Sequence, residues 1–220
     1  MALTLYAHPF SSYCQKVLIA LFENEIPFSF CTLGAPDSPA NIELARHWPL
    51  KRMPLLLDGE LAVMEATIII EHLDLKYPGR QRWLPQDPEV ALEVRFLDRF
   101  FDNYIHAPMQ AIVGNALRAP EQRNAKNVAD AQALLKVSYR WLEERMANRE
   151  WAAANSFTLA DCAAAPALFY ADWVQRIDAG IFPRVAAYRQ RLNARPSFAR
   201  AIEAARPFRP LFPLGAPDRD

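Results

Sequence analysis

The chain has 220 residues, of which 52% are hydrophobic and 23% charged, an ordinary composition for a folded protein of one large or two small domains. Basic and acidic residues balance at 25 each, so the sequence offers no basic surplus for nucleic acid. No apolar run approaches the roughly 20 residues of a membrane span, and the N-terminal residues lack a signal-peptide pattern. We therefore expect a cytoplasmic protein without membrane or nucleic-acid partners.

The cysteines are few and scattered. Cys14, Cys31 and Cys162 form no C-x-x-C pair and have no metal-ligand spacing. The pattern therefore predicts neither disulfides nor a bound metal.

Strand and helix patterns alternate over residues 1–78. Strands are expected at 3–6, 27–32, 55–57 and 61–63, and helices at 13–24, 40–46 and 65–77. Asp58-Gly59 is a hairpin signal, and Pro78-Gly79 ends the last helix. The order predicts a small β-α-β-α-β-β-α domain.

After a Pro-rich linker over residues 79–88, strand signals vanish. A long amphipathic helix is expected over 89–117, bent near Pro108, and further helices at 121–147, 182–193 and 197–206. Thr158 and Asp161 form a capping box that opens another helix. Residues 89–220 are therefore predicted to be an all-α domain, ending in a Pro-rich tail.

The most informative local pattern is an apolar strand followed by a helix N-terminus. Met53-Pro54 enters the strand, and Glu65 opens the helical pattern that follows. A helix N-terminus presents unpaired N–H groups, which bind a carboxylate.

Four segments together resemble the cytosolic glutathione S-transferase family over nearly the whole chain. Residues 11–17 resemble the S-S-x-x-x-R-V motif of zeta-type members, and 48–54 resemble N-P-x-G-K-V-P. Residues 65–69 resemble E-S-x-A-I, and 158–161 match the T-L-A-D capping box. The resemblance is to a bacterial, serine-type member with a zeta/tau-like N-terminal motif. It implies a thioredoxin-like domain followed by a helical bundle, with glutathione as co-substrate.

The resemblance also implies which residues bind glutathione: Arg52, Met53, Pro54, Glu65, Ala66 and Thr67. Pro54 is expected to be cis, with the Met53 backbone pairing with the cysteinyl residue. Glu65 is expected to receive the glutamyl ammonium. Two residues depart from the family pattern, since Lys51 replaces a glycine and Ala66 replaces a serine whose hydroxyl commonly binds the glutamyl carboxylate. Thr67 can replace that hydroxyl in part.

The resemblance makes Ser11 the first candidate catalytic residue. Its hydroxyl, just before a helix, can donate to the glutathione sulfur while the helix dipole favours a thiolate. Ser12 can do the same after a small shift of the loop, Tyr6 is a further rival, and the simplest alternative is that Ser11 only caps the helix. Cys14 falls on the resolving position of redox relatives and is expected to be an inert core thiol.

A second substrate is expected between the two domains. Tyr104, Met109, Ile112 and Val113 are predicted to line an apolar pocket that Phe208 and Phe212 of the tail cover. The alternative for each residue is an ordinary place in the helical core.

The sequence thus predicts a detoxifying transferase that conjugates glutathione to an apolar electrophile. Two alternatives stay open: a zeta-like cis–trans isomerase, although Tyr13 stands where zeta members carry cysteine, and a non-catalytic binding or regulatory protein, which Ala66 and Lys51 favour. The resemblance implies a homodimer formed through the helices at 65–77, 89–117 and 121–147.

Overall fold

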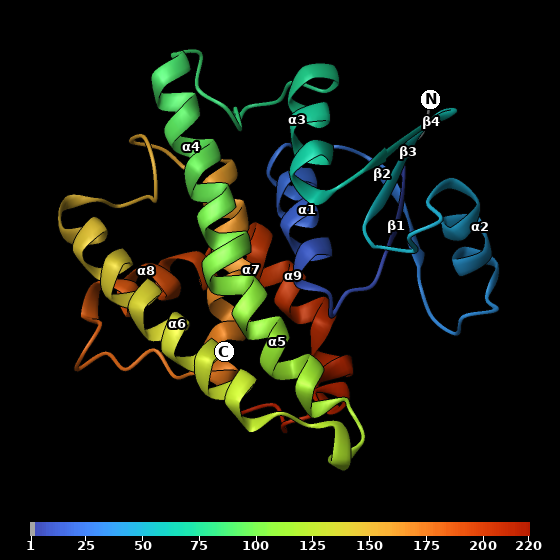
Figure 1. Ribbon diagram of the computed structural model, residues 1–220. Helices are drawn as coiled ribbons and strands as arrows, with labels where there is room; N and C mark the ends of the chain where they lie inside the picture. Colours follow the sequence, from blue (N-terminus) through green and yellow to red (C-terminus); the bar gives the residue numbers. More distant parts are fainter. Residues whose placement is uncertain (1–2) are drawn as a thin grey trace.

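The computed structural model describes residues 3–220, which fold into a small α/β domain beside a larger helical domain (Figure 1). The first domain contains β1 (Leu3–Ala7), α1 (Ser12–Glu23), β2 (Phe28–Thr32), α2 (Pro39–His47), β3 (Leu55–Asp58), β4 (Leu61–Met64) and α3 (Ala66–Lys76). This is the predicted order, and the thioredoxin-like fold is confirmed.

The sheet has the strand order β2-β1-β3-β4. β1 pairs parallel with β2 and antiparallel with β3, and β3 pairs antiparallel with β4. The β3–β4 hairpin turns at Gly59-Glu60, where Gly59 has a φ of 62°. A glycine adopts this left-handed conformation without a steric penalty, which explains the hairpin signal.

Alternate residues of the strands face different helices. Leu5 and Leu56 belong to the main core with α1 and α3, whereas Leu55 packs with Leu44 of α2 in a smaller cluster on the other face. Figure 1 shows α2 outside the sheet and α1 and α3 between the sheet and the helical domain. The main core therefore runs from the sheet through α1 into the second domain.

The second domain begins with α4 (Pro88–Phe100), which continues through a π-helix at Phe101–His106 into α5 (Ala107–Ala116). The helix expected over 89–117 is therefore continuous but changes its winding. Pro108 has no N–H to donate to the carbonyl of Tyr104, four residues earlier, and the Ala107 N–H instead bonds the Asp102 carbonyl, five residues earlier.

The remaining helices are α6 (Ala125–Arg145), α7 (Leu159–Val174), α8 (Pro183–Asn193) and α9 (Pro196–Ala205). Short 3₁₀ turns lie at Pro120–Gln122, Met146–Asn148 and Arg206–Leu211. The first of them delays α6 by four residues relative to the expected start at 121. No helix within residues 3–220 is both long and apolar enough to cross a membrane.

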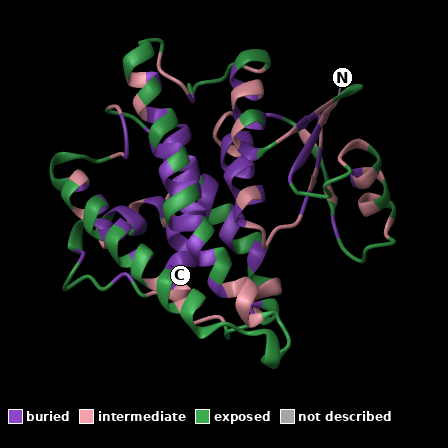
Figure 2. Ribbon diagram, in the orientation of Figure 1, coloured by how far each residue is buried: buried purple, intermediate pink, exposed green. Residues whose placement is uncertain are grey.

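Helix α7 forms the centre of the helical domain and is almost completely buried (Figure 2). The predicted capping box holds its N-terminus. The buried Asp161 carboxylate accepts from the Thr158 N–H at 2.8 Å, the Ala152 N–H at 2.9 Å and the Tyr188 hydroxyl at 2.6 Å. Burial raises the pKa of Asp161, and these donors oppose that shift.

Candidate functional site

Strand register brings the predicted glutathione-binding segments to one end of the sheet. Tyr6 pairs with Leu55, so the turn after β1 lies beside the start of β3. Leu55 also pairs with Met64, so the end of β4 and Glu65 lie on its other side. The start of α1, the Met53–Pro54 segment and the start of α3 therefore converge at the same end of the sheet.

Ser11 is the N-cap of α1. Its backbone is extended, with φ −85° and ψ 121°, and its Oγ accepts from the Cys14 N–H at 3.4 Å. Capping uses a lone pair of the oxygen and not the hydroxyl proton. The Ser11 hydroxyl also hydrogen-bonds to Cys14, which opposes the rise in the pKa of that thiol, so a ligand sulfur would compete with Cys14 for the hydroxyl proton.

Ser12 faces the helical domain instead. It is buried, and its Oγ forms a hydrogen bond with Nε2 of His106, on the π-helix. Gln110 Nε2 lies 3.3 Å from the same His106 nitrogen. Burial and then the Lys16 charge lower the pKa of His106 to about 3, so the imidazole is neutral near pH 7. These contacts hold Ser12 toward His106 and leave Ser11 as the better-placed hydroxyl.

The other candidate groups near this turn are poorly suited to the chemistry. Tyr6 packs in the cluster under α2, and burial raises the pKa of its hydroxyl. Cys14 is completely buried, and burial raises the pKa of its thiol to about 11. A buried thiol with a raised pKa is a poor nucleophile, as predicted.

The Met53–Pro54 peptide bond is cis, as predicted. Met53 and Arg52 are exposed just before β3, and within residues 3–220 the Met53 backbone makes no hydrogen bond. Lys51 has a φ of 53°, in the left-handed region where glycine fits best. This conformation explains why the family motif carries glycine there, and the lysine adopts it all the same.

The N-terminus of α3 has the geometry of an anion site. Ile69 is the first residue whose N–H bonds back, to the Glu65 carbonyl at 2.8 Å, so Ala66, Thr67 and Ile68 lack intrahelical acceptors. Glu65 is exposed with a φ of 68°. Strained backbone of this kind concentrates at ligand sites.

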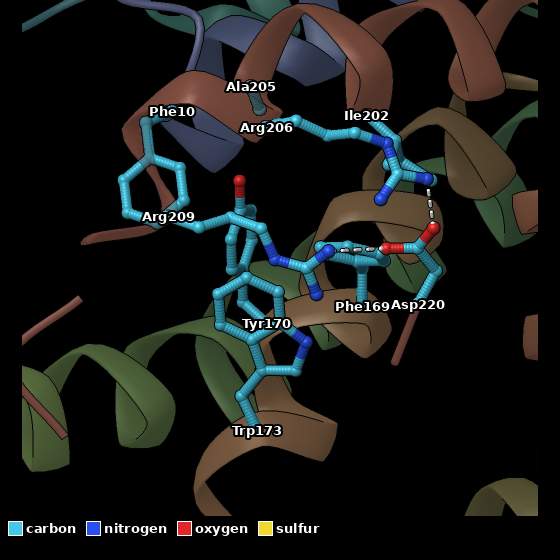
Figure 3. A pocket seen from close by; sticks show the side chains of 9 residues that line it. All are labelled: Phe10, Phe169, Tyr170, Trp173, Ile202, Ala205, Arg206, Arg209 and Asp220. Carbon is cyan, nitrogen blue, oxygen red and sulfur yellow. Dashed lines mark hydrogen bonds and ion pairs between the residues drawn. The ribbon is translucent and has the colours of Figure 1, made fainter. Parts of the chain in front are cut away.

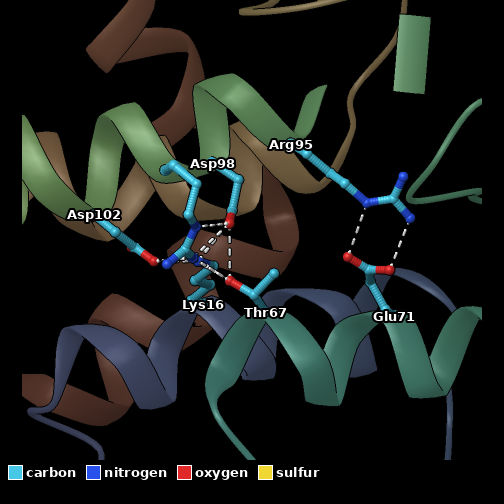
Figure 4. A network of polar contacts seen from close by, with 7 residues as sticks. Lys16, Thr67, Glu71, Arg95, Asp98 and Asp102 are labelled. Atoms are coloured by element: carbon cyan, nitrogen blue, oxygen red, sulfur yellow. Dashed lines mark hydrogen bonds and ion pairs between the residues drawn. The ribbon is translucent and has the colours of Figure 1, made fainter. Parts of the chain in front are cut away.

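The Thr67 hydroxyl is fully used by a polar network between the domains (Figure 4). It donates to Asp98 Oδ2 at 2.9 Å and accepts from Lys16 Nζ at 2.9 Å and Arg99 Nη2 at 2.6 Å. One proton and two lone pairs are all that a hydroxyl has. The expectation that this hydroxyl replaces the missing serine is therefore wrong, although the Thr67 N–H remains available.

Lys16 is the centre of that network. Its ammonium lies 2.6 Å from Asp98 Oδ1 and 3.1 Å from Asp102 Oδ2, and the Lys16 side chain is 1% exposed. Burial is the largest influence on Asp102 and raises its pKa, and the Lys16 charge opposes the shift. The network ties α1 and α3 of the first domain to α4 and the π-helix of the second.

The four residues predicted for the second-substrate pocket do not form one. Met109 and Ile112 are buried in the core, and Val113 packs against it. Tyr104 is exposed and lies 5.7 Å from the ring of Phe100, which in turn packs on Trp141 of α6. In this structure Met109, Ile112 and Val113 occupy places in the helical core, the alternative given for each of them, and Tyr104 faces solvent.

A hollow does lie beside the turn that carries Ser11 (Figure 3). Phe10, Tyr170, Trp173 and Arg209 line it, and Asp220 pairs with Arg206 and Arg209 at its rim. Phe212 of the tail packs on Trp173 at 5.0 Å, and Phe208 packs on His8 at 4.6 Å. Phe208 of the tail thus covers the β1–α1 turn, whereas the sequence predicts that Phe208 and Phe212 cover a pocket lined by residues of the long helix. Phe10, adjacent to Ser11 in the sequence, is the residue that could have indicated this hollow.

Comparisons with known proteins agree with this geometry. Residues 5–81 match the glutathione S-transferase N-terminal domain, and residues 100–196 match the C-terminal domain. Glutathione S-transferase theta-1 of Bos taurus is 27% identical over 212 residues, covering 88% of this chain and 83% of that protein. A probable maleylacetoacetate isomerase of Vibrio cholerae is 27% identical over 219 residues, covering 94% and 98%.

Among solved structures, a glutathione S-transferase from Methylobacterium radiotolerans in complex with glutathione sulfonate has a TM-score of 0.79 at 29% identity. The match covers 92% of this chain and 95% of that one. Fold and site together define a two-domain protein with a thioredoxin-like first domain and an all-helical second domain. The chain belongs to the glutathione S-transferase family.

Proposed function

We propose that the protein is a glutathione transferase that conjugates the glutathione thiolate to an apolar electrophile. The observation that carries the proposal is the convergence of Ser11, the Met53 backbone and the α3 N-terminus at one end of the sheet. Each matches one part of glutathione: the sulfur, the cysteinyl backbone and the glutamyl carboxylate. Glu65, which opens α3, would hold the glutamyl ammonium.

The chemistry follows from these positions. The Ser11 hydroxyl donates to the sulfur, and the N-terminus of α1 favours its negative charge, so the thiol ionises near neutral pH. The thiolate attacks the electrophilic carbon and forms a C–S bond, while the leaving group departs with the bonding electrons. Phe10, Tyr170 and Trp173 make the surroundings of this turn aromatic, which favours an apolar second substrate, although the hollow among them is only about 10 Å³ in this structure.

The proposal is tested by retention on immobilised glutathione and by a thiol-conjugation assay with a panel of aromatic electrophiles. We expect that free glutathione elutes the protein and that the rate of thioether formation is proportional to the protein concentration. Retention without turnover of any electrophile would favour a non-catalytic binding protein, a reading that Ala66 and Lys51 support.

The relative named as a probable maleylacetoacetate isomerase and the Ser11-Ser12 pair favour a second candidate function, glutathione-dependent cis–trans isomerisation. The thiolate would add to one carbon of a cis enedione and push the π electrons onto the carbonyl oxygen as an enolate. The former double bond would rotate, and return of the electron pair would expel the thiolate and leave the trans double bond. A cis enedione incubated with catalytic glutathione distinguishes the two, because isomerisation consumes no thiol and conjugation does.

We also propose that the protein is a homodimer formed through α3, α4 and α6. These helices expose large apolar side chains, among them Ile68, Leu92, Phe96, Val137 and Trp141. A two-fold interface would cover the same patch on both copies. Light scattering at micromolar concentration should give about twice the chain mass of 25.0 kDa, and a particle of 25.0 kDa would refute the dimer.

A further inference from the structure

The α3 N-terminus lacks a side-chain hydroxyl for a bound carboxylate. Ala66 has none, and the Thr67 hydroxyl has no lone pair or proton left. A cation lies beside this helix end, however. Arg99 of α4 donates to Thr67 Oγ1 at 2.6 Å, and side chains of a helix lean toward its N-terminus. The guanidinium therefore contacts the second residue of α3, close to the helix end where a carboxylate would bind.

The Arg99 guanidinium is held on one edge and open on the other. Nε and Nη2 donate to Asp98 Oδ2 at 3.0 and 2.6 Å, and Nη2 also contacts Asp102 Oδ2 at 2.5 Å. Within residues 3–220, Nη1 has no hydrogen-bond partner, and the Arg99 side chain is 52% exposed. A guanidinium fixed in this way has little side-chain freedom left to lose when it binds a carboxylate.

The charges of the network leave this cation available. Lys16 neutralises the buried side of the two carboxylates, through Asp98 Oδ1 at 2.6 Å and Asp102 Oδ2 at 3.1 Å. Two cations thus face two carboxylates, and the positive N-terminal end of α3 adds to the potential at the open edge. An anion placed there meets no uncompensated negative charge from the network.

We infer that Arg99 binds the α-carboxylate of the glutamyl residue of glutathione through Nη1, in place of the serine hydroxyl absent at position 66. The inference rests on the proposed function, since it names a contact of the same site. In it, the Ala66 and Thr67 N–H groups and Arg99 share the carboxylate, and Glu65 holds the neighbouring ammonium.

The chain contains a matched control for this role. Arg95 also lies on α4 and also bridges to α3, with Nη2 2.9 Å from Glu71 Oε2, and its side chain is 48% exposed. It lies one helical turn farther from the α3 N-terminus (Figure 4). Arg95→Gln therefore removes an equivalent interdomain ion pair without touching the carboxylate site.

Titration calorimetry should compare glutathione with its analogue 4-aminobutyryl-cysteinyl-glycine, which keeps the ammonium and lacks the α-carboxylate. We expect Arg99→Gln to raise the Kd for glutathione by about 10- to 100-fold and the Kd for the analogue by less than about threefold. Arg95→Gln should change both by less than about twofold. Glu65→Gln should weaken both ligands, because both carry the ammonium.

A rescue variant sharpens the test. Adding Ala66→Ser to Arg99→Gln should recover part of the lost affinity, since the hydroxyl supplies a new donor to the carboxylate. If Arg99→Gln misfolds by circular dichroism, Arg99→Gln with Asp102→Asn keeps the network neutral and should show the same selective loss.

Two results would overturn the inference alone: unchanged glutathione affinity in Arg99→Gln, or an equal loss for glutathione and the analogue, which would mean that Arg99 acts only through structure. Failure of the unmodified protein to bind glutathione would instead overturn the proposed function together with this contact.

Discussion

Ser11→Ala is expected to lower the conjugation rate at pH 6.5 by about 100-fold, the usual effect of removing one donor from a developing or bound anion. Ser11 is the N-cap of α1, where its hydroxyl oxygen accepts from the Cys14 N–H. Without it, the bound thiol should titrate closer to its ordinary pKa of about 8.5. Glutathione affinity should change little, because the sulfur contributes little to recognition. The measurement is the thiolate absorbance of the complex against pH, paired with kcat.

Ser12→Ala is the control, since the Ser12 hydroxyl is directed to His106 and not to the turn. It should leave the thiol titration nearly unchanged. Ser11→Thr keeps a hydroxyl that can both cap and donate, and should retain most activity. If Ser11 served only as a helix cap, Ser11→Ala would lower stability by about 0.5–2 kcal/mol and leave the thiol titration as in the wild type. That outcome would move the search to Ser12 or Tyr6.

Lys16→Met is expected to reduce the free energy of unfolding by about 3–5 kcal/mol. The substitution keeps the length of the side chain and removes the cation that faces Asp98 and Asp102 in a site that is 1% exposed at Lys16 and Asp98. Arg99 alone would then face two carboxylates. Urea unfolding followed by circular dichroism gives the change from the transition midpoint.

Two further variants identify the cause of that loss of stability. Lys16→Met with Asp98→Asn removes one charge of each sign and should recover much of the stability, because the penalty comes from an uncompensated buried charge and not from lost packing. Lys16→Arg, the residue of the family motif, should keep the ion pairs and unfold close to the wild type. A Lys16→Met protein that loses less than about 1 kcal/mol would show that the network contributes little to stability.

Local sequence signals predict the bounds of the helices and strands of the first domain to within a residue or two. A β-strand with period-two burial, a Gly turn and a capped helix each depend on neighbouring residues, so the β3–β4 hairpin and the Thr158–Asp161 capping box could be recognised directly. The helix patterns of the second domain were equally visible, since a buried stripe repeats every three to four residues.

The surroundings of Tyr104, Met109, Ile112 and Val113 depend on more than local pattern. The π-helix at Phe101–His106 lies between α4 and α5 and changes which side chains of this long helix face the core. Pro108 predicts a bend in this helix. Nothing within a few residues of it shows which winding the chain adopts.

What the sequence by itself determined is therefore the order of elements, the two-domain organisation and the three segments proposed to bind glutathione, because these follow from contacts close in the chain and from short motifs. What only the tertiary structure decided is which side chains meet across the domains. The hydroxyl of Ser12 is directed to His106, and that of Thr67 is consumed by Lys16, Asp98 and Arg99. Arg99 reaches Thr67 from α4, more than thirty residues further along the chain. Such contacts depend on how α1, α3 and α4 pack against one another, and no local pattern encodes that packing.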